Sequence, residues 1–141
     1  MLSGKERAYF KAAKAVSTLS DHRCQHGCVV ISKHKIVSSG YNSKSRYHPI
    51  QARADQKYFN NQNALGCVHA ELDALRPLIN QKSFDFSTST LYVYRQNKLG
   101  ELANSRPCPR CMDLIRTLGI KKIHYTTDGG FASELVLKEN I

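Results

Sequence analysis

The sequence has few features that would set this chain apart from an ordinary globular protein. It has no apolar run long enough to span a bilayer, no internal repeat and no compositionally biased tract. A secretory signal needs an uninterrupted apolar stretch, and here the first fourteen residues are broken by charges at Lys5, Glu6, Arg7 and Lys11. We therefore expect a cytoplasmic protein without membrane contacts, folded as a single domain over residues 1–141.

Cysteine content and charge narrow the class of protein only a little. Five cysteines are an odd number, which fits reduced thiols or metal ligands better than a disulfide framework. The net charge of +10 arises from 21 Lys and Arg against 11 Asp and Glu. Such an excess is compatible with a mononucleotide, a polynucleotide or merely a solvated surface, so charge alone does not identify a partner.

The first half of the chain predicts a helix followed by a β-hairpin. Ser3 and Glu6 have capping-box spacing. Apolar residues then recur on one face of a helix that should end near Ser20: Tyr9, Ala12, Val16 and Leu19. Two short β-branched runs, at 28–31 and 36–37, predict a hairpin with a tight turn. Residues 43–66 follow as a long polar connection, which in a small domain is usually functional or disordered.

The second half predicts helices alternating with strands. Leu72, Leu75 and Ile79 mark one helix face, and Pro77 should bend or end that helix. Strands are expected at 90–94 and 120–125, separated by a helix that starts near two prolines and closes at Gly119. Residues 135–137 fit either a last strand or a helical turn. This order favours a layered α/β fold with a hairpin at one edge and parallel neighbours later.

Two short segments, each opening a predicted helix, carry the candidate chemistry: Cys-Val-His-Ala-Glu at 67–71 and Pro-Cys-Pro-Arg-Cys at 107–111. Cys108 and Cys111 are three residues apart on one helix face, so both sulfurs can reach one metal ion, and the positive helix end favours their thiolate forms. His69 can supply the third ligand. Three protein ligands on a tetrahedral Zn²⁺ leave one position for water, which is typical of a catalytic site.

Glu71 follows His69 by two residues and is placed to move protons rather than to bind the metal. His-x-Glu followed by Pro-Cys-x-x-Cys is the signature of zinc-dependent nucleobase deaminases. Through these motifs the sequence resembles the cytidine and deoxycytidylate deaminase superfamily over roughly residues 5–126, most closely its deoxycytidylate deaminase-like members. Gly40-Tyr41-Asn42 is a weaker third match.

The resemblance implies a three-layer α/β/α domain with a mixed central sheet, Zn²⁺ as cofactor and a small-molecule nucleotide as substrate. The implied reaction is hydrolytic deamination of a cytosine nucleotide, as from dCMP to dUMP, with release of ammonia and with Glu71 protonating N3 of the ring. It also implies that Asn42 contacts the sugar. The peptide groups beside Ala70 and Pro107 are expected to hold the base edge.

Two further residues have alternative interpretations. Arg106 departs from the residues that precede the second motif's first proline in the family. It is expected either to bind a substrate phosphate, because guanidinium matches phosphate oxygens in a bidentate way, or to sit in solvent. Tyr125 either lines the pocket or is an ordinary core aromatic of a strand.

Other functions remain open from the sequence. A polynucleotide deaminase acting on cytosine or adenosine in single-stranded DNA, RNA or tRNA suits the net charge. The long connection also has basic and aromatic residues suited to binding a single nucleic-acid strand: Lys44, Arg46, Tyr47, His48, Arg53, Lys57 and Tyr58.

A second alternative is a non-catalytic binding module in which Cys67 is a fourth zinc ligand, but this alternative leaves Glu71 unexplained. The two histidines and two cysteines within 22–28 are poorly spaced for a second metal. Related enzymes commonly associate, so a homo-oligomer is compatible with the resemblance.

Overall fold

The computed structural model describes residues 2–43 and 69–136. The helices in these ranges are α1 (Gly4–Ser17), α3 (Ala70–Ile79) and α4 (Pro109–Leu118), with a short 3-10 helix, η1 (Phe86–Thr88). The strands are β1 (Gln25–Ser32), β2 (Lys35–Tyr41), β3 (Ser89–Gln96), β4 (Lys122–Thr127) and β5 (Gly130–Leu135). Most of the polar connection at 43–66, with its basic and aromatic residues, lies outside the described residues, as does Cys67.

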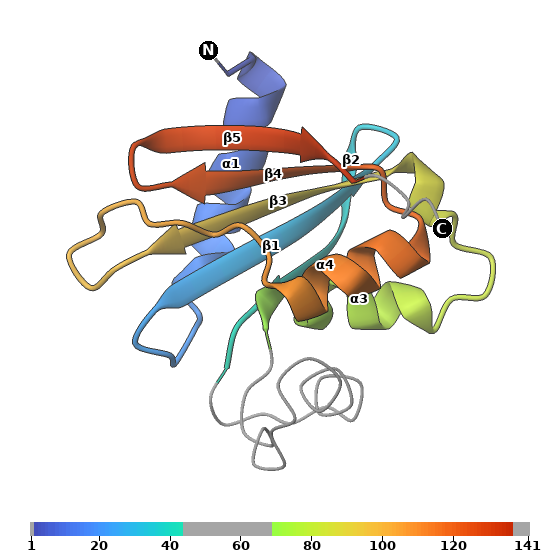
Figure 1. Ribbon diagram of the computed structural model, residues 1–141, viewed down its shortest axis with the longest axis horizontal. Helices are drawn as coiled ribbons and strands as arrows, with labels where there is room; N and C mark the ends of the chain where they lie inside the picture. The colour runs from blue at the N-terminus through green and yellow to red at the C-terminus, as the bar shows by residue number, and fades with distance from the viewer. Residues whose placement is uncertain (1, 44–68, 137–141) are drawn as a thin grey trace.

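The strands form one mixed sheet in the order β2-β1-β3-β4-β5. β1 runs antiparallel to β2 and β3, β3 is parallel to β4, and β4 is antiparallel to β5. Figure 1 shows α1 on one face of the sheet and α3 with α4 on the other. The predicted α/β class, the three layers, the edge hairpin and the parallel pair are therefore confirmed. The chain near Leu135 is the end of a strand, β5, rather than a helical turn.

Helix α1 begins as predicted and ends earlier. Both hydrogen bonds of the Ser3–Glu6 capping box are present, but the helix stops at Ser17, three residues before the expected end. Its fully buried positions are Phe10, Ala13 and Ser17, one residue further along than the predicted face. Tyr9, Ala12 and Val16 pack beside them, while Leu19, beyond the helix end, is 64% exposed. The assignment of Leu19 to the buried face was wrong because the helix does not reach it.

The other two helices follow their sequence signals with one difference. α4 starts with Pro109 in its first turn and closes at Gly119, whose φ of 92° is the left-handed conformation that favours glycine at this position. α3 contains Pro77 and continues for two residues past it. A proline there removes one main-chain hydrogen bond, which a helix packed on the sheet can tolerate.

Two apolar cores lie on the two faces of the sheet. Because side chains alternate along a strand, Leu91 and Val93 of β3 face α3 and α4, whereas Tyr92 and Tyr94 face α1. In the described parts of the chain, no helix is both long and apolar enough to cross a membrane.

Gly40 of β2 sets how closely α3 can approach the sheet. A Cβ at this position would lie 2.7 Å from the main-chain oxygen of Ala70 and 2.7 Å from the main-chain carbon of Asp73. Both neighbours belong to the helix backbone, which cannot rotate away as a side chain can. Glycine at position 40 therefore permits the contact that holds the start of α3 against the end of β2.

We predict that Gly40→Ala lowers the free energy of unfolding by about 2 kcal/mol, because the added methyl group forces α3 away from β2. Urea denaturation at a fixed zinc concentration measures this change. Gly129→Ala is the matched control, since a Cβ there meets no atom within 4 Å, and its unfolding free energy should change by less than about 0.5 kcal/mol. Equal midpoints for the two variants would contradict the role of the close approach.

Candidate active site

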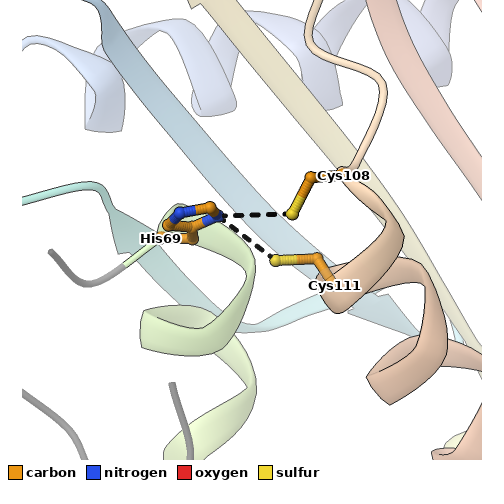
Figure 2. A group of neighbouring side chains, drawn as sticks. All are labelled: His69, Cys108 and Cys111. Carbon is orange, nitrogen blue, oxygen red and sulfur yellow. Dashed lines mark hydrogen bonds between the residues drawn. The ribbon is translucent and has the colours of Figure 1, made fainter. Parts of the chain in front are cut away.

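The N-termini of α3 and α4 bring the two sequence motifs together. His69 is the residue immediately before α3 and Cys108 is the residue immediately before α4, and both have extended backbone conformations. Figure 2 shows the imidazole of His69 pointing from the start of α3 toward the sulfurs of Cys108 and Cys111 at the start of α4. Segments far apart in the sequence thus present three donor atoms to one point.

The spacing of these donor atoms fits a zinc ion. Nδ1 of His69 lies 3.7 Å from Sγ of Cys108 and 3.4 Å from Sγ of Cys111, and all three ligand atoms lie within 4.8 Å of one another. Tetrahedral zinc with ordinary Zn–N and Zn–S bonds requires nitrogen and sulfur to be about 3.6 Å apart. Among the described residues, this is the only group of three or more potential ligands close enough to hold a metal, and it includes none of the histidines or cysteines within 22–28.

The two cysteines share their protons unequally. The hydrogen bond from Cys111 lowers the pKa of Cys108 to about 3, so Cys108 is a thiolate at neutral pH. The same hydrogen bond, together with burial, raises the pKa of Cys111. Burial lowers the pKa of His69, but the hydrogen bond with Cys108 and the charge of Glu71 outweigh it, and the net shift is upward. A cation is therefore favoured beside these sulfurs.

Glu71 is fully enclosed beside the three donor atoms. Its Oε1 has no hydrogen-bond partner among the described residues, and burial raises the pKa of its carboxyl group. His69, the next largest influence, lowers that pKa. A buried carboxyl group with an unmet oxygen and a raised pKa can both accept and donate a proton near neutral pH.

A pocket of about 270 Å³ borders the candidate metal site at His69. His69 and Ala70 contribute to its wall from the start of α3, and the other lining residues come from the segment before β1, the end of β2 and the end of β3: His22, Cys24, His26, Asn42, Ser43 and Arg95. None of these described lining residues is a carboxylate. Burial, with a smaller contribution from Arg95, lowers the pKa of His26 to about 4, so this imidazole is neutral at pH 7.

Comparison with known proteins assigns the family. Residues 3–127 match the model of the cytidine and deoxycytidylate deaminase zinc-binding region. The chain belongs to this deaminase family. Among curated proteins, no sequence is similar enough to count as a relative.

Solved structures of deaminases share the fold. The dCMP deaminase of cyanophage S-TIM5, in apo form, is 25% identical, with a TM-score of 0.62, and the alignment covers 89% of this chain and 84% of that one. The same enzyme in complex with dCMP and dUMP is 23% identical, with a TM-score of 0.61 and coverage of 89% and 82%. Cytidine deaminase from Burkholderia pseudomallei is 15% identical, with a TM-score of 0.64 and coverage of 96% and 94%.

In this deaminase-family chain, Asn42 lies in the pocket wall and is extensively bonded. Its Oδ1 accepts hydrogen bonds from the Ser20 hydroxyl at 2.6 Å and the His26 amide at 2.8 Å, and its Nδ2 donates to the Cys24 carbonyl at 2.7 Å. Asn42 therefore shapes the segment before β1 as well as lining the pocket. Its expected contact with a sugar stays a prediction, as does the expected contact of the Ala70 and Pro107 peptides with a base; Pro107 is buried but does not line the pocket.

Arg106 and Tyr125 meet at Glu134 of β5 rather than at the pocket. The Arg106 guanidinium forms two hydrogen bonds of 2.9 Å with the Glu134 carboxylate, and the Tyr125 hydroxyl donates to the same group at 2.8 Å. Neither residue is among the described residues that line the pocket. The structure thus gives Arg106 an ion-pair partner that neither sequence interpretation considered, and it packs the Tyr125 ring against the core.

Sequence reasoning missed Arg95. This residue lies near the end of β3, with guanidinium nitrogens 3.2 Å from Cys24 Sγ and 3.2 Å from the Asn104 carbonyl oxygen. It reaches the pocket because the start of β1 pairs with the end of β3, with His26 opposite Arg95. The signal available in the sequence was a charged residue directly after the apolar run 91–94. Cys28, by contrast, is a fully buried core thiol whose pKa burial raises.

We predict that Cys108→Ala abolishes zinc binding, because the remaining imidazole and thiol cannot hold the ion against dialysis. The zinc content of purified, dialysed protein, measured by mass spectrometry, should fall from about one ion per chain to less than about a tenth of that value. Cys28→Ala removes a buried thiol on the sheet and should retain the metal. Native zinc content in Cys108→Ala would exclude Cys108 as a ligand.

Proposed function

We propose that residues 1–141 form one zinc-dependent catalytic domain that hydrolyses the exocyclic amine of a cytosine mononucleotide, converting dCMP or a close analogue to the uracil nucleotide and ammonia. The observation that carries this proposal is the convergence of His69, Cys108 and Cys111 beside the buried, unpartnered carboxyl oxygen of Glu71. A purely structural metal site has no use for that carboxyl group. The 25% identity with a dCMP deaminase supports the choice of substrate.

Zinc held by these three residues would supply a Lewis acid that makes water acidic enough to yield hydroxide near neutral pH. Glu71 takes a proton from the attacking water and delivers it to N3 of the base. Glu71 then takes the remaining proton from the oxygen that is now bonded to C4 and gives it to the leaving nitrogen. The bond between C4 and the amine breaks, the C4 carbonyl of the uracil product forms, and ammonia departs. Enclosure of Glu71 excludes competing bulk water from this proton exchange.

Arg95 supports a substrate that carries a phosphate group. It is the one permanently charged side chain among the described residues that line the pocket, since His26 is neutral at pH 7. An anionic oxygen in the pocket would be attracted by the positive charge of this guanidinium, and a nucleoside would not provide one. We therefore assign Arg95, rather than Arg106, to phosphate recognition.

We predict that Glu71→Gln slows deamination of dCMP by about 10²- to 10⁴-fold, because the amide cannot carry the proton. Ammonia release measures the rate, and the zinc content should stay at the native level. Glu101→Gln, which changes an exposed carboxylate on the loop after β3, is the matched control and should keep the native rate. Glu71→Gln with undiminished turnover would remove the carboxyl group from the mechanism.

We predict that Arg95→Gln weakens binding of dUMP roughly tenfold, because it removes a charge-assisted hydrogen bond. Binding of deoxyuridine, which lacks the phosphate, should change less than about twofold. Calorimetry on the zinc-loaded protein measures both affinities, and Arg7→Gln on α1 serves as the control for a lost positive charge. An equal loss for both ligands would show that Arg95 acts on the pocket's shape instead of on phosphate.

A polynucleotide substrate is the second candidate, favoured by the net charge of +10. To distinguish the mononucleotide from the polynucleotide substrate, ammonia release is measured from dCMP and from short cytosine- or adenosine-bearing oligonucleotides. Each is measured at two salt concentrations. For a polynucleotide enzyme the logarithm of affinity falls with the logarithm of salt by about one unit of slope per phosphate neutralised. Turnover of mononucleotides alone would exclude this candidate.

A further inference from the structure

A second cavity, of about 500 Å³, lies far from the catalytic pocket. Ile31 and Tyr92 in its wall belong to the core beneath α1, so the cavity is on the opposite face of the sheet from α3 and α4. It is also at the opposite end of the strands, where β1 ends and where β3 and β4 begin. The two cavities share no lining residue.

Hydrogen bonds between three elements hold the cavity's walls in place. The hairpin turn between β1 and β2 has left-handed backbone at Lys33 and His34, with φ of 51° and 67°. The Tyr9 hydroxyl of α1 donates to the His34 carbonyl at 3.1 Å, which ties that turn to the helix. On the other side, the hydroxyls of Ser32 and Thr88 lie 2.9 Å apart and join the end of β1 to η1, which directly precedes β3.

The cavity has an excess of positive charge. Lys5 from α1, Lys33 from the hairpin turn and Lys122 from β4 all line it. In the described parts of the chain, no carboxylate lies within ion-pair distance of these three ammonium groups. The one acid in the wall, Glu6, is already engaged, because its carboxylate accepts the Ser3 amide of the capping box and lies 3.6 Å from Nδ1 of His124.

The two tyrosine rings of the wall are not available to stack on a ligand. The ring of Tyr92 is only 5% exposed and lies flat against His124, with ring centres 4.2 Å apart. The Tyr9 ring packs on Tyr92, and its hydroxyl is bonded to the hairpin turn. Recognition in this cavity therefore depends on ammonium and hydroxyl groups, which suit phosphate oxygens, and not on base stacking.

We propose that this cavity binds a small polyphosphate, meaning a di- or triphosphate group that is either free or carried by a small molecule. Three lysines from three different elements match an anion with more than one charge, and the hydroxyl of Thr90, which also lines the cavity, adds a neutral donor. The volume lies in the range of small-molecule sites. Single-stranded nucleic acid requires instead a groove with aromatic platforms, and neither Tyr9 nor Tyr92 offers one.

Calorimetry with tripolyphosphate on the zinc-loaded protein tests this inference at constant ionic strength. We expect saturable binding of one anion per chain. The double variant Lys33→Gln/Lys122→Gln should weaken this binding roughly tenfold or more, through loss of two charge-assisted contacts. Lys11→Gln/Lys82→Gln removes the same charge from exposed positions that do not line the cavity, and should bind within about twofold of the native protein.

Two further measurements identify which cavity binds the anion and whether the bound polyphosphate is free or part of a small molecule. Arg95→Gln should bind tripolyphosphate as the native protein does, which separates this site from the catalytic pocket and from the proposed deamination. If the cavity accepts a polyphosphate that is attached to a small molecule, ATP should bind at least as tightly as tripolyphosphate. If tripolyphosphate binds and ATP does not, the ligand is the free anion. Either outcome supports a polyphosphate site.

Several results would overturn the inference. No saturable binding, or an equal loss of affinity in the two double variants, would leave only a diffuse positive surface. Loss of binding in Arg95→Gln would place the anion in the catalytic pocket. Tighter binding of a thymidine oligonucleotide than of tripolyphosphate, abolished by Lys33→Gln/Lys122→Gln, would assign the same lysines to nucleic acid.

Discussion

The separation between the first residues of α3 and α4 is the constraint on which the candidate active site depends. Donor atoms 3.4 and 3.7 Å apart come from helices 39 residues apart in the chain, and nothing local to either motif fixes that spacing. α3 is fixed on β2 by the Gly40 close approach, by the Ser38 hydroxyl donating to the Ala74 carbonyl at 2.6 Å, and by the Tyr41 amide donating to the Asp73 carboxylate at 3.1 Å.

α4 is positioned by hydrogen bonds of the segment that precedes it. The Ser105 hydroxyl donates to the Val93 carbonyl at 2.8 Å and accepts the Thr126 amide at 2.7 Å, so the segment that leads into α4 is tied to both β3 and β4. These two strands are the parallel pair at the centre of the sheet. The spacing of the three donor atoms is thus a consequence of strand pairing, which also holds a buried acid beside two thiols. Such a group is stable in a protein interior when a cation compensates it.

The sequence predicted the elements, the hairpin and the parallel pair, and missed side-chain contacts that depend on the register of the strands. A capping box at Ser3, a left-handed Gly119 and the two motifs at helix starts each act within a few residues, and the fold class followed from the order of such segments. Arg95 could not be found in this way, because it reaches the pocket only through the register that sets it opposite His26. The Arg106–Glu134 ion pair escaped for the same reason, since its partners are 28 residues apart on neighbouring segments.

Strand alternation also explains how one small sheet can present two separate cationic sites. Near the start of β3, the residues that face α1 line the larger cavity. Near the end of the same strand, Arg95 lines the pocket beside α3. Lys33 and Lys122 lie at that first end, so their charges are separated from Glu71 by the length of the strands and by the apolar cores on both faces. β1 and β3 are the two strands that contribute residues to both cavities. An anion bound on the α1 face would therefore act on the pocket beside α3 through movement of these strands.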